Sequence, residues 1–489
     1  MIGSAALGIT LGVPLLAALL TALPGNHGQP LARASGVVTL IAALTVAAVV
    51  AGHGSLVIDA GNWAPPAGIR LRADGLASVL LVITALTLLA ILLATRHAQI
   101  RAATGPRQAQ LIWPLLLLAW GAINAILVSN DLFNVFVGLE LLTLAAIALV
   151  ALNGRAAALR AAIGYLLVAL SGSLLYLLGV VLLYSAHGTL DLGLLAGQLS
   201  THDAVALGAI TVGLAAKTAL FPFHGWLPPA HGEAPSPASA LLSALVTKAS
   251  FVMLIRIWFD VAPTLLTDIA ALALGLLGAT AMLYGSLLAL RQQRLKQVIA
   301  YSTVAQIGYL FLLFPLLHNA SPGTADAAWV GTLLHAIAHA LAKASLFLCA
   351  GLVIIGVGHD RLPGLRGLVR SQPLTVFAFA LGAIVLMGLP PTLGFSAKYL
   401  MMTAAFSAGQ PGWALLLVVA GLLAAAYLYR PLALAFSSAS AATHSKVPWQ
   451  QQFPALLLAL TATLLGLASG LVETQLQIGW TAPGGGVQR

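Results

Sequence analysis

Fourteen long apolar runs are the feature of this sequence that most constrains its fold. Each run has about 17 residues or more, enough for a helix to cross the ~30 Å hydrocarbon core of a bilayer. The runs are continuously apolar and lack the strict alternation of a membrane-spanning β-strand. The sequence therefore predicts an all-α polytopic membrane protein with about fourteen transmembrane helices. The predicted spans are 2–23, 32–51, 74–95, 108–128, 132–152, 162–184, 205–221, 236–258, 267–289, 297–316, 327–355, 374–404, 413–435 and 452–471.

The composition excludes the soluble classes of protein. Hydrophobic residues make up 60% of the 489 residues and charged residues only 7%, with a mean hydropathy of +1.00. Ordinary globular chains are roughly a quarter charged, so soluble enzymes, nucleic-acid binders and secreted disulfide scaffolds do not fit. Cys349 is the single cysteine, and the sequence has no CxxC, dinucleotide fingerprint or P-loop. We expect no cofactor, no metal and no covalent catalysis of the chain's own.

Charged loop residues alternate in sign along the chain. The loops after odd-numbered spans contain Arg33, Arg96, Arg101, Arg107, Arg155, Arg160, Arg291, Arg294, Arg361, Arg366, Arg370, Arg430 and Lys446. The loops after even-numbered spans contain Arg70 and Arg72 but otherwise acids, namely Asp59, Asp131, Asp191, Asp203, Asp260, Asp268 and Asp326. Because lysine and arginine concentrate on the cytoplasmic side, we expect a multi-pass protein of the bacterial inner (plasma) membrane with both termini outside.

A few charged residues lie deep inside the apolar runs. Glu140 is the one acid of twelve in such a position. Four of the six lysines share this depth: Lys217, Lys248, Lys343 and Lys398. Lys446 is in a loop and Lys296 is at a helix start, while nearly all sixteen arginines stay in loops or near interfaces.

These deep lysines need a physical reason. On insertion scales a charged lysine at the bilayer centre costs ~2.5–3.5 kcal/mol, so four would cost on the order of 10–14 kcal/mol. Such groups are kept where they face a hydrated interior and have partners. Lysine, unlike arginine, can release its proton when it is buried. Lysines with one carboxylate are thus the components of a proton relay, and structural ion pairs or snorkelling side chains are the simpler alternative.

Two histidines extend this set. His335, His339 and Lys343 are spaced i, i+4 and i+8, so they lie on nearly one helix face over ~12 Å. Histidine changes charge near neutral pH, so such a stripe could carry protons across part of a membrane. A zinc site is the rival interpretation of the histidine pair, but the sequence offers it no neighbouring carboxylate or cysteine.

Two spans are interrupted by prolines and glycines. The breaks are at Pro222 and Gly225, after Lys217, and at Pro390, Pro391 and Gly394, before Lys398. Proline frees backbone groups that a membrane tolerates where protein or water solvates them, although the prolines could instead only kink packed helices. Matching breaks suggest inverted repeats. We expect N-terminal helices in 1–105, two inverted five-helix repeats in 106–258 (spans 4–8) and 259–437 (spans 9–13), and helix 14 with the tail in 438–489.

Four segments carry a family resemblance. AAKTALFPFHGWLPPAHGEAPSPASALLSALVTKASFVMLIR (215–256) resembles the helix 7–8 signature of the antiporter-like subunits of respiratory complex I, membrane-bound hydrogenases and Mrp-type cation/proton antiporters. Segments 130–152, 335–351 and 390–400 resemble the family's helices 5, 11 and 12. The resemblance covers about residues 106–437. FPFHGWLPPAHGEAPS is most similar to the D-type subunits of Mrp antiporters, and Lys398 departs from the complex I member that has glutamate there.

The resemblance implies roles for the matching residues. Glu140 and Lys217 would form a coupled acid–lysine pair, and Lys248 would be the next relay lysine. Lys343 would be the central lysine and Lys398 the terminal one. His335 and His339 would bridge this line, while His224 and Glu233, in the helix 7–8 connection, would be structural or lie on an access path.

The expected function is that of a proton-translocating membrane subunit of a Mrp-type multisubunit Na⁺(K⁺)/H⁺ antiporter, working with other membrane subunits. The first alternative is a proton-pumping subunit of a redox-driven complex, either complex I or a membrane-bound hydrogenase. The second is a self-contained solute carrier, which would transport as a purified single chain. Only one deep acid is present, so the chain is better suited to carry protons than sodium.

Overall fold

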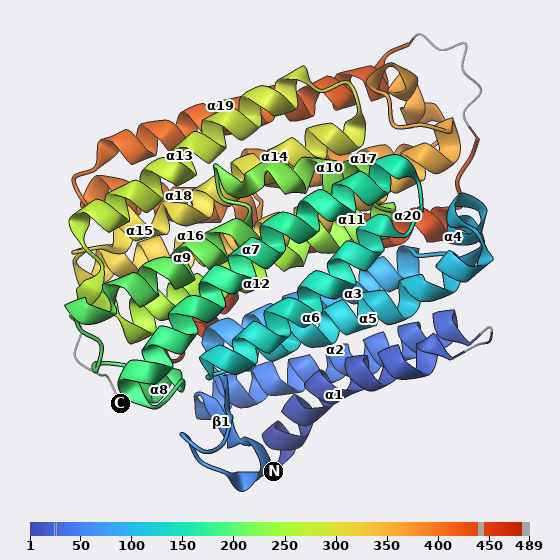
Figure 1. Ribbon diagram of the computed structural model, residues 1–489. Coiled ribbons are helices and arrows are strands. Elements are labelled where there is room, and N and C mark those ends of the chain that lie inside the picture. The colour runs from blue at the N-terminus through green and yellow to red at the C-terminus, as the bar shows by residue number, and fades with distance from the viewer. Residues whose placement is uncertain (24, 26, 439–444, 482–489) are drawn as a thin grey trace.

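The computed structural model describes residues 1–23, 25, 27–438 and 445–481. Its helices run side by side as one elongated bundle (Figure 1). Continuous apolar sequence forms helices here because a helix satisfies every backbone polar group within the segment. The N-terminal helices are α1 (Ile2–Ala22), α2 (Gly28–His53), α3 (Gly75–Ala94) and α4 (His97–Thr104). A short antiparallel hairpin, β1 (Leu56–Asp59) and β2 (Arg70–Ala73), connects α2 to α3.

The first predicted repeat folds into five helical units. They are α5 (Pro106–Val128), α6 (Leu132–Ala151), α7 (Ala156–His187), α9 (Ala204–Thr218) and a helix over 236–261 that comprises α11 (Ser236–Leu241), α12 (Thr247–Ile255) and two π-helical segments, Leu242–Val246 and Arg256–Val261. Short helices α8 (Leu192–Leu195) and α10 (Leu227–Glu233) lie in the connections. The break after Thr218 separates α9 from α10, as the prolines there predict.

The second predicted repeat has the same order of helices, and again its fourth span is broken. Its helices are α13 (Asp268–Arg291), α14 (Leu295–Phe311) with α15 (Leu313–Leu317), α16 (Pro322–Val357), the pair α17 (Pro373–Met387) and α18 (Leu393–Ser407), and α19 (Pro411–Phe436). The matching breaks agree with the predicted fold class of two five-helix repeats. The domain boundaries themselves stay a prediction, since the helices pack into one bundle.

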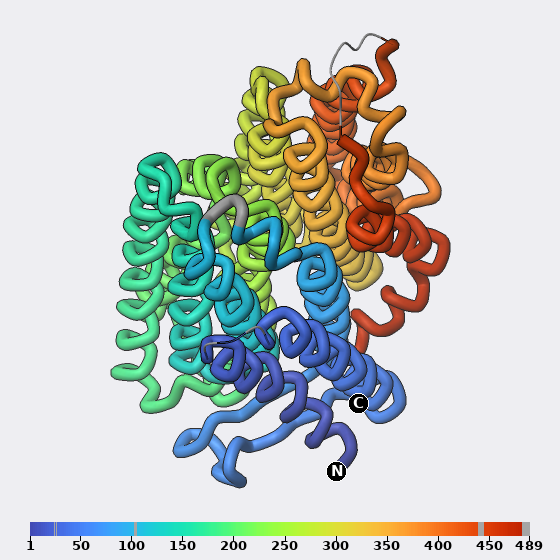
Figure 2. The backbone as a smooth tube through the Cα atoms, turned by 90° about the vertical axis from the view of Figure 1, so that its right-hand side faces the viewer, coloured from blue at the N-terminus to red at the C-terminus, as the bar shows by residue number. Residues whose placement is uncertain are grey.

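The C-terminal segment returns to the N-terminal helices. α20 (Trp449–Leu467) and α21 (Ser469–Leu476) meet at an 80° bend, and both pack against α3. Figure 2 shows this last segment running down beside the blue N-terminal helices. Gly75 donates its N–H to the Ile478 carbonyl (2.9 Å), and Trp480 stacks on Trp329 of α16 (3.8 Å between ring centroids). Of the predicted tail, residues 482–489 lie outside the described part.

The number of spans agrees closely with the prediction. Within the described residues, twelve helices are long and apolar enough to cross a membrane, and the bent pair α20–α21 provides a thirteenth. The span predicted over 374–404 is the pair α17–α18, so a count of fourteen requires joining these two helices across their break. Predicted and observed ends differ by six residues at most, at the start of α7, predicted at 162 and found at Ala156.

The two ends of the bundle differ in charge. At one end, here called the basic face, residues around Arg96, Arg155, Arg294 and Gln451 meet around one cavity. At the other end, the acidic face, the first residues of several helices are capped by aspartates such as Asp131 and Asp191. The exceptional arginines of this face are paired: Arg70 bonds Asp59 (2.8 Å), and Arg72 lies 3.4 Å from Asp74. The hydrogen bond from Arg70 lowers the pKa of the Asp59 carboxyl.

Candidate functional site

Glu140 and Lys217 form an ion pair between α6 and α9. The Lys217 ammonium lies 3.0 Å from the Glu140 carboxylate and donates a second hydrogen bond to the Thr143 hydroxyl at 2.9 Å. Ser173 of α7 donates to the same carboxylate. The lysine side chain is 5% exposed and the glutamate 27%. The carboxylate and the Thr143 hydroxyl therefore replace water that the buried ammonium has lost, and Ser173 stabilises the carboxylate.

The break that follows Lys217 keeps its backbone groups occupied. α9 ends at Thr218, and Ala219 takes a left-handed conformation (φ 60°). Leu220 N–H donates to the Ala215 carbonyl at 3.0 Å, and the Trp226 indole donates to the Ala216 carbonyl at 3.2 Å. The carbonyls of Ala215 and Ala216 at this helix end thus accept hydrogen bonds from Leu220 and Trp226. The Lys217 ammonium is bonded by side chains instead.

Lys248 is the next lysine along the line. Thr218, beside Lys217, donates to Ser250 of α12 at 2.9 Å, which ties the two lysine-bearing helices together. The Lys248 ammonium donates to the Ser243 carbonyl at 2.6 Å, within the π-helical segment that precedes it. No described carboxylate pairs with Lys248, which is 4% exposed. A neutral carbonyl stabilises an ammonium less than a carboxylate does, so this lysine is suited to pass its proton on.

Two buried histidines adjoin Lys248. His339 of α16 interacts electrostatically with Lys248, Lys343, His335 and His231, and neither of its ring nitrogens has a protein partner. His231 of α10 also has two unpartnered nitrogens, is fully buried, and stacks on Phe347 (5.0 Å). Buried polar atoms without protein partners usually bind ordered water. Among the described residues, no three His, Cys, Asp or Glu side chains form a group that could hold a metal ion.

His231 is the residue that the sequence analysis missed. It interacts electrostatically with Lys248, Lys296 and Lys343, so it lies among the lysines although it comes from the helix 7–8 connection. Ser239 fixes the local backbone by donating to the His231 carbonyl at 2.9 Å. The available signal was its position in LPPAHGEAP: prolines in a membrane protein can carry a connection inward as well as outward.

Lys343 forms its hydrogen bonds with α14. Its ammonium donates to the Ile299 carbonyl (3.0 Å) and to the Ser302 hydroxyl, both on α14. It is fully buried and interacts electrostatically with Lys248 and His339. His335, two turns away on α16, interacts with Lys398 and with Lys248. His339 and His335 therefore both interact with Lys248, and His335 also interacts with Lys398.

Lys398 occupies the second helix break. Its ammonium donates to the carbonyls of Leu386 (2.7 Å) and Met387 (3.0 Å), the last residues of α17. It also lies 4.8 Å from the ring of Tyr309, which stacks on His335. Gly388 (φ 80°) permits this approach, because a Cβ there would come 2.6 Å from the Lys398 side chain. The α17–α18 break therefore supplies the acceptors for the lysine that follows it.

The structure brings seven predicted residues into one buried line: Glu140, Lys217, Lys248, His335, His339, Lys343 and Lys398. The lysines on it are between 0% and 7% exposed. Near these residues are buried polar atoms without a hydrogen-bond partner, including the Tyr309 hydroxyl and the Gln306 side-chain oxygen. Such atoms indicate hydration along the line.

His224 and Glu233 do not come together. His224 packs against the rings of Phe221 and Tyr284, at 5.4 and 5.0 Å. Glu233 lies at the end of α10, 3.3 Å from Arg294 on the basic face. Glu233 lines the basic-face cavity, and the access roles of both residues stay predictions.

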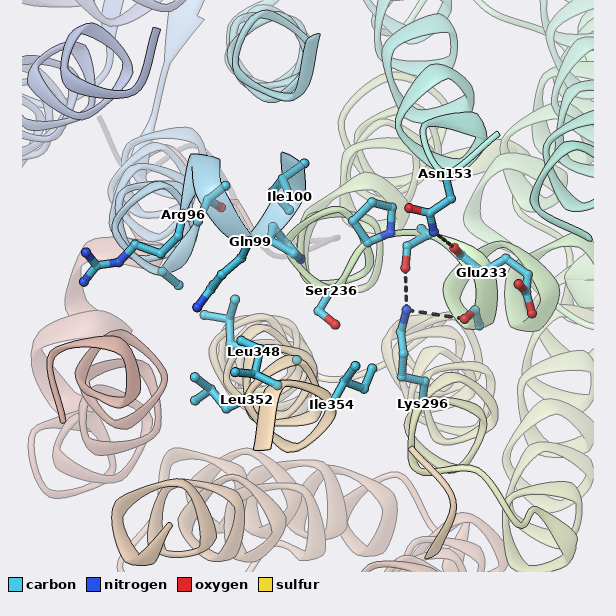
Figure 3. Close-up of a pocket in the computed structure, with 18 of the residues that line it drawn as sticks. Arg96, Gln99, Ile100, Asn153, Glu233, Ser236, Lys296, Leu348, Leu352 and Ile354 are labelled. Atoms are coloured by element: carbon cyan, nitrogen blue, oxygen red, sulfur yellow. Dashed lines mark hydrogen bonds between the residues drawn. The ribbon is translucent and has the colours of Figure 1, made fainter. Parts of the chain in front are cut away.

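A cavity of about 260 Å³ opens at the basic face. Figure 3 shows Gln99, Ser236 and Lys296 around it, with Leu348 and Leu352 of α16 forming an apolar wall. A water molecule occupies about 30 Å³ in the liquid, so several fit. The cavity can thus hold water at the basic face, beside Gly232 and Glu233.

The fold and the site together define a class: a polytopic α-helical membrane protein with a connected line of protonatable side chains in its interior. The chain belongs to the NADH:quinone oxidoreductase/Mrp antiporter transmembrane family, which matches residues 129–424. The resemblance drawn from the sequence motifs is confirmed.

Three relatives illustrate the range of this family. The N subunit of the NADH-quinone oxidoreductase of Desulforudis audaxviator is 38% identical over 86% of this chain and 84% of its own. The D-type subunit of a Na⁺/H⁺ antiporter of Alkalihalophilus pseudofirmus is 28% identical over 75% of this chain and 73% of its own. A chain in the structure of the Mrp complex from Dietzia is 26% identical, with a TM-score of 0.86 over 97% of both chains. The family thus includes subunits of antiporters and of redox complexes.

Proposed function

We propose that this chain is the proton-translocating membrane subunit of a Mrp-type multisubunit Na⁺(K⁺)/H⁺ antiporter. The observation that carries the proposal is the buried line from Glu140 to Lys398, in which every lysine has a hydrogen-bond acceptor and one has a carboxylate. The relatives in antiporter complexes support the assignment to that kind of assembly. The chain works with other membrane subunits, which supply the cation path.

The first step is charge coupling at the ion pair. With the Glu140 carboxylate at 3.0 Å, Lys217 is stabilised in its charged form. When the two separate, the ammonium keeps only the Thr143 hydroxyl, and its proton moves toward Lys248. Coupled groups of this kind titrate as a unit, so the state of the pair controls the whole line.

Water and histidines carry the proton onward. His339 and His231 have four ring nitrogens free to bind water beside Lys248. From there the proton passes His335 to Lys398, while Lys343 exchanges protons with His339. Each transfer moves a proton between nitrogen atoms through bound water and needs no covalent chemistry.

The basic face is the cytoplasmic side of a bacterial plasma membrane in this proposal, with both termini outside. The excess of arginine in the connections at that face supports it. The test uses the Cys349→Ala protein with Lys446→Cys at the basic face. A membrane-impermeant thiol reagent should label Lys446→Cys in everted vesicles and not in intact cells. Labelling from outside intact cells would reverse the orientation.

The experiment for the function measures ion-dependent pH change in everted vesicles that contain the intact complex. Glu140→Ala and Lys217→Ala should each reduce it at least about tenfold, a difference of about 1.4 kcal/mol. Lys446→Met, at an exposed loop position, is the matched control and should behave as wild type. Full activity of both variants in an assembled complex would refute the proposal.

A second candidate function is that of a proton-pumping subunit in a redox-driven complex. The 38% identity to a quinone oxidoreductase subunit favours it specifically. The same line would then move protons, powered by electron transfer in partner subunits. Purification of the native complex separates the two: iron–sulfur subunits in it indicate the redox complex, and small membrane subunits alone indicate the antiporter.

A further inference from the structure

A fifth buried lysine, Lys296, lies outside the line described above. It is the second residue of α14 and is 3% exposed. Its ammonium donates to the Ala234 carbonyl and, at 3.4 Å, to the Gly232 carbonyl, both at the end of α10. The sequence places this lysine at a helix start, and the fold buries it against α10.

Lys296 lines the basic-face cavity and also contacts the residue next to His231. Its ammonium points to the carbonyls beside Glu233 and Asn153, as Figure 3 shows. It also interacts electrostatically with His231, the chain neighbour of Gly232, whose carbonyl accepts from the ammonium. Lys296 therefore lines the cavity and lies close to His231, whose two ring nitrogens have no protein partner.

The charges nearby do not neutralise Lys296. The groups that act on it electrostatically are Asp360, Arg294 and Glu233. Arg294 bonds both acids, at 3.0 Å to Asp360 and 3.3 Å to Glu233. The acids are therefore already paired, and the hydrogen bonds of the buried ammonium go to two neutral carbonyls. Such a lysine can exist in both charge states, as a carrier of protons must.

We infer that Lys296 loads protons from the basic-face cavity onto His231, and thereby connects that face to the line of lysines. Building on the proposed function, this identifies the step by which protons reach the line. Lys296 takes a proton from cavity water, passes it to a His231 ring nitrogen, and is recharged from the cavity. His231 then exchanges it with Lys248 and Lys343.

The test compares Lys296→Arg with Lys296→Met in the intact complex. Arginine keeps the positive charge and the donors for both carbonyls but does not release its proton. We expect both variants to reduce ion-dependent pH change at least about tenfold. In Lys296→His, activity should return with a pH profile shifted toward acid. If Lys296→Arg were as active as wild type, the lysine would be structural and the inference would be overturned.

Two controls keep the outcome interpretable. Lys446→Arg makes the same exchange at an exposed position and should leave activity unchanged, and the yield of assembled complex reports on folding. Glu140→Ala and Lys217→Ala are measured in parallel. If these are inactive while Lys296→Arg is active, only the loading role fails. If they are active, the proposed function itself fails.

A second measurement addresses the cavity and does not alter Lys296. In the Cys349→Ala background, Ser236→Cys places a thiol in the cavity wall. Complete modification with a bulky, water-soluble methanethiosulfonate should reduce proton movement at least about fivefold, because it fills the approach to Lys296. Unchanged activity after complete modification would show that protons reach the line elsewhere and would overturn the inference.

Discussion

The two broken helices each place a lysine in the membrane interior, but they stabilise it in different ways. At the first break, Lys217 pairs with a carboxylate and a hydroxyl, while the carbonyls of the helix end are used by Leu220 and Trp226. At the second, Lys398 has no carboxylate partner among the described residues and takes the carbonyls of Leu386 and Met387 for itself.

This difference shows two ways to hold an ammonium in a membrane. A carboxylate provides a full opposite charge, so the two groups depend on each other and separation changes both. The end of a helix provides fixed partial charges that do not titrate. The first site can therefore act as a switch, whereas the second keeps the environment of its ammonium constant. The predictions below compare the two sites, from the largest expected effect to the smallest.

Removing Lys217 should have the largest effect on stability. Lys217→Met leaves the Glu140 carboxylate without its partner, and breaking a buried ion pair costs about 3–5 kcal/mol. Because Glu140 is 27% exposed, we expect about half of that. Thermal unfolding of the purified complex measures it. The double variant with Glu140→Gln should recover most of the loss, and additive effects would contradict the pairing.

Gly388→Ala should disturb the second site alone. Its left-handed φ of 80° costs a residue with a Cβ about 1–2 kcal/mol, and the Cβ would push the Lys398 side chain off its carbonyls. We expect a lower melting temperature and a several-fold loss of proton movement. Gly412→Ala, where a Cβ meets open space in a helix, is the control. Wild-type activity for Gly388→Ala would show that Lys398 needs no fixed contact.

Thr143→Val removes one acceptor of Lys217 and keeps the carboxylate. A single hydrogen bond to a charged group contributes about 1.5–3 kcal/mol, and we expect the lower end because Glu140 remains. Proton movement should fall by a few-fold, since the lysine loses the partner that it keeps when the pair separates. Thr461→Val, at a partly buried threonine of α20, serves as control. An unchanged melting temperature would show that the hydroxyl contributes nothing.

Lys398→Met should change stability least while abolishing function. It removes two hydrogen bonds of a charged group, but it also removes the cost of burying an ammonium that has no carboxylate partner. Because these two effects oppose each other, we expect a shift in unfolding free energy within about 1 kcal/mol. Ion-dependent pH change should nevertheless fall at least about tenfold. Measuring Lys398→Met and Lys217→Met in the same preparation tests most directly whether the two lysines are stabilised differently. Equal destabilisation by the two variants would show that they are not.

The spans and the deep charges could be predicted because hydrophobicity dictates both. Apolar runs locate the long helices within a few residues but not the short α4, α8 and α10, and ionisable groups inside the long helices point inward by necessity. Glu140 and the four deep lysines follow from depth alone. The alternation of loop charges likewise matches the two faces of the bundle.

The remaining parts of the site depend on tertiary packing. Neither the carbonyl partners of Lys398 nor the hydroxyl link between Thr218 and Ser250 can be read from residue types. His231 lies in a proline-rich connection, which looks exposed until the fold turns it inward. Lys296 is similar, since its burial depends on α10 lying over the start of α14. The contacts of Lys343 with α14 also required coordinates.

α16 has one further consequence for this mechanism. It is a single uninterrupted helix of 36 residues, about 54 Å long, and it carries His335, His339 and Lys343. The spacing of these three groups is therefore fixed by helical geometry and does not change during transport. A rotation or a shift of this helix would reset all three distances to the opposing lysines at once. A partner protein that binds either end of α16 and moves the helix would therefore change all three of these distances together.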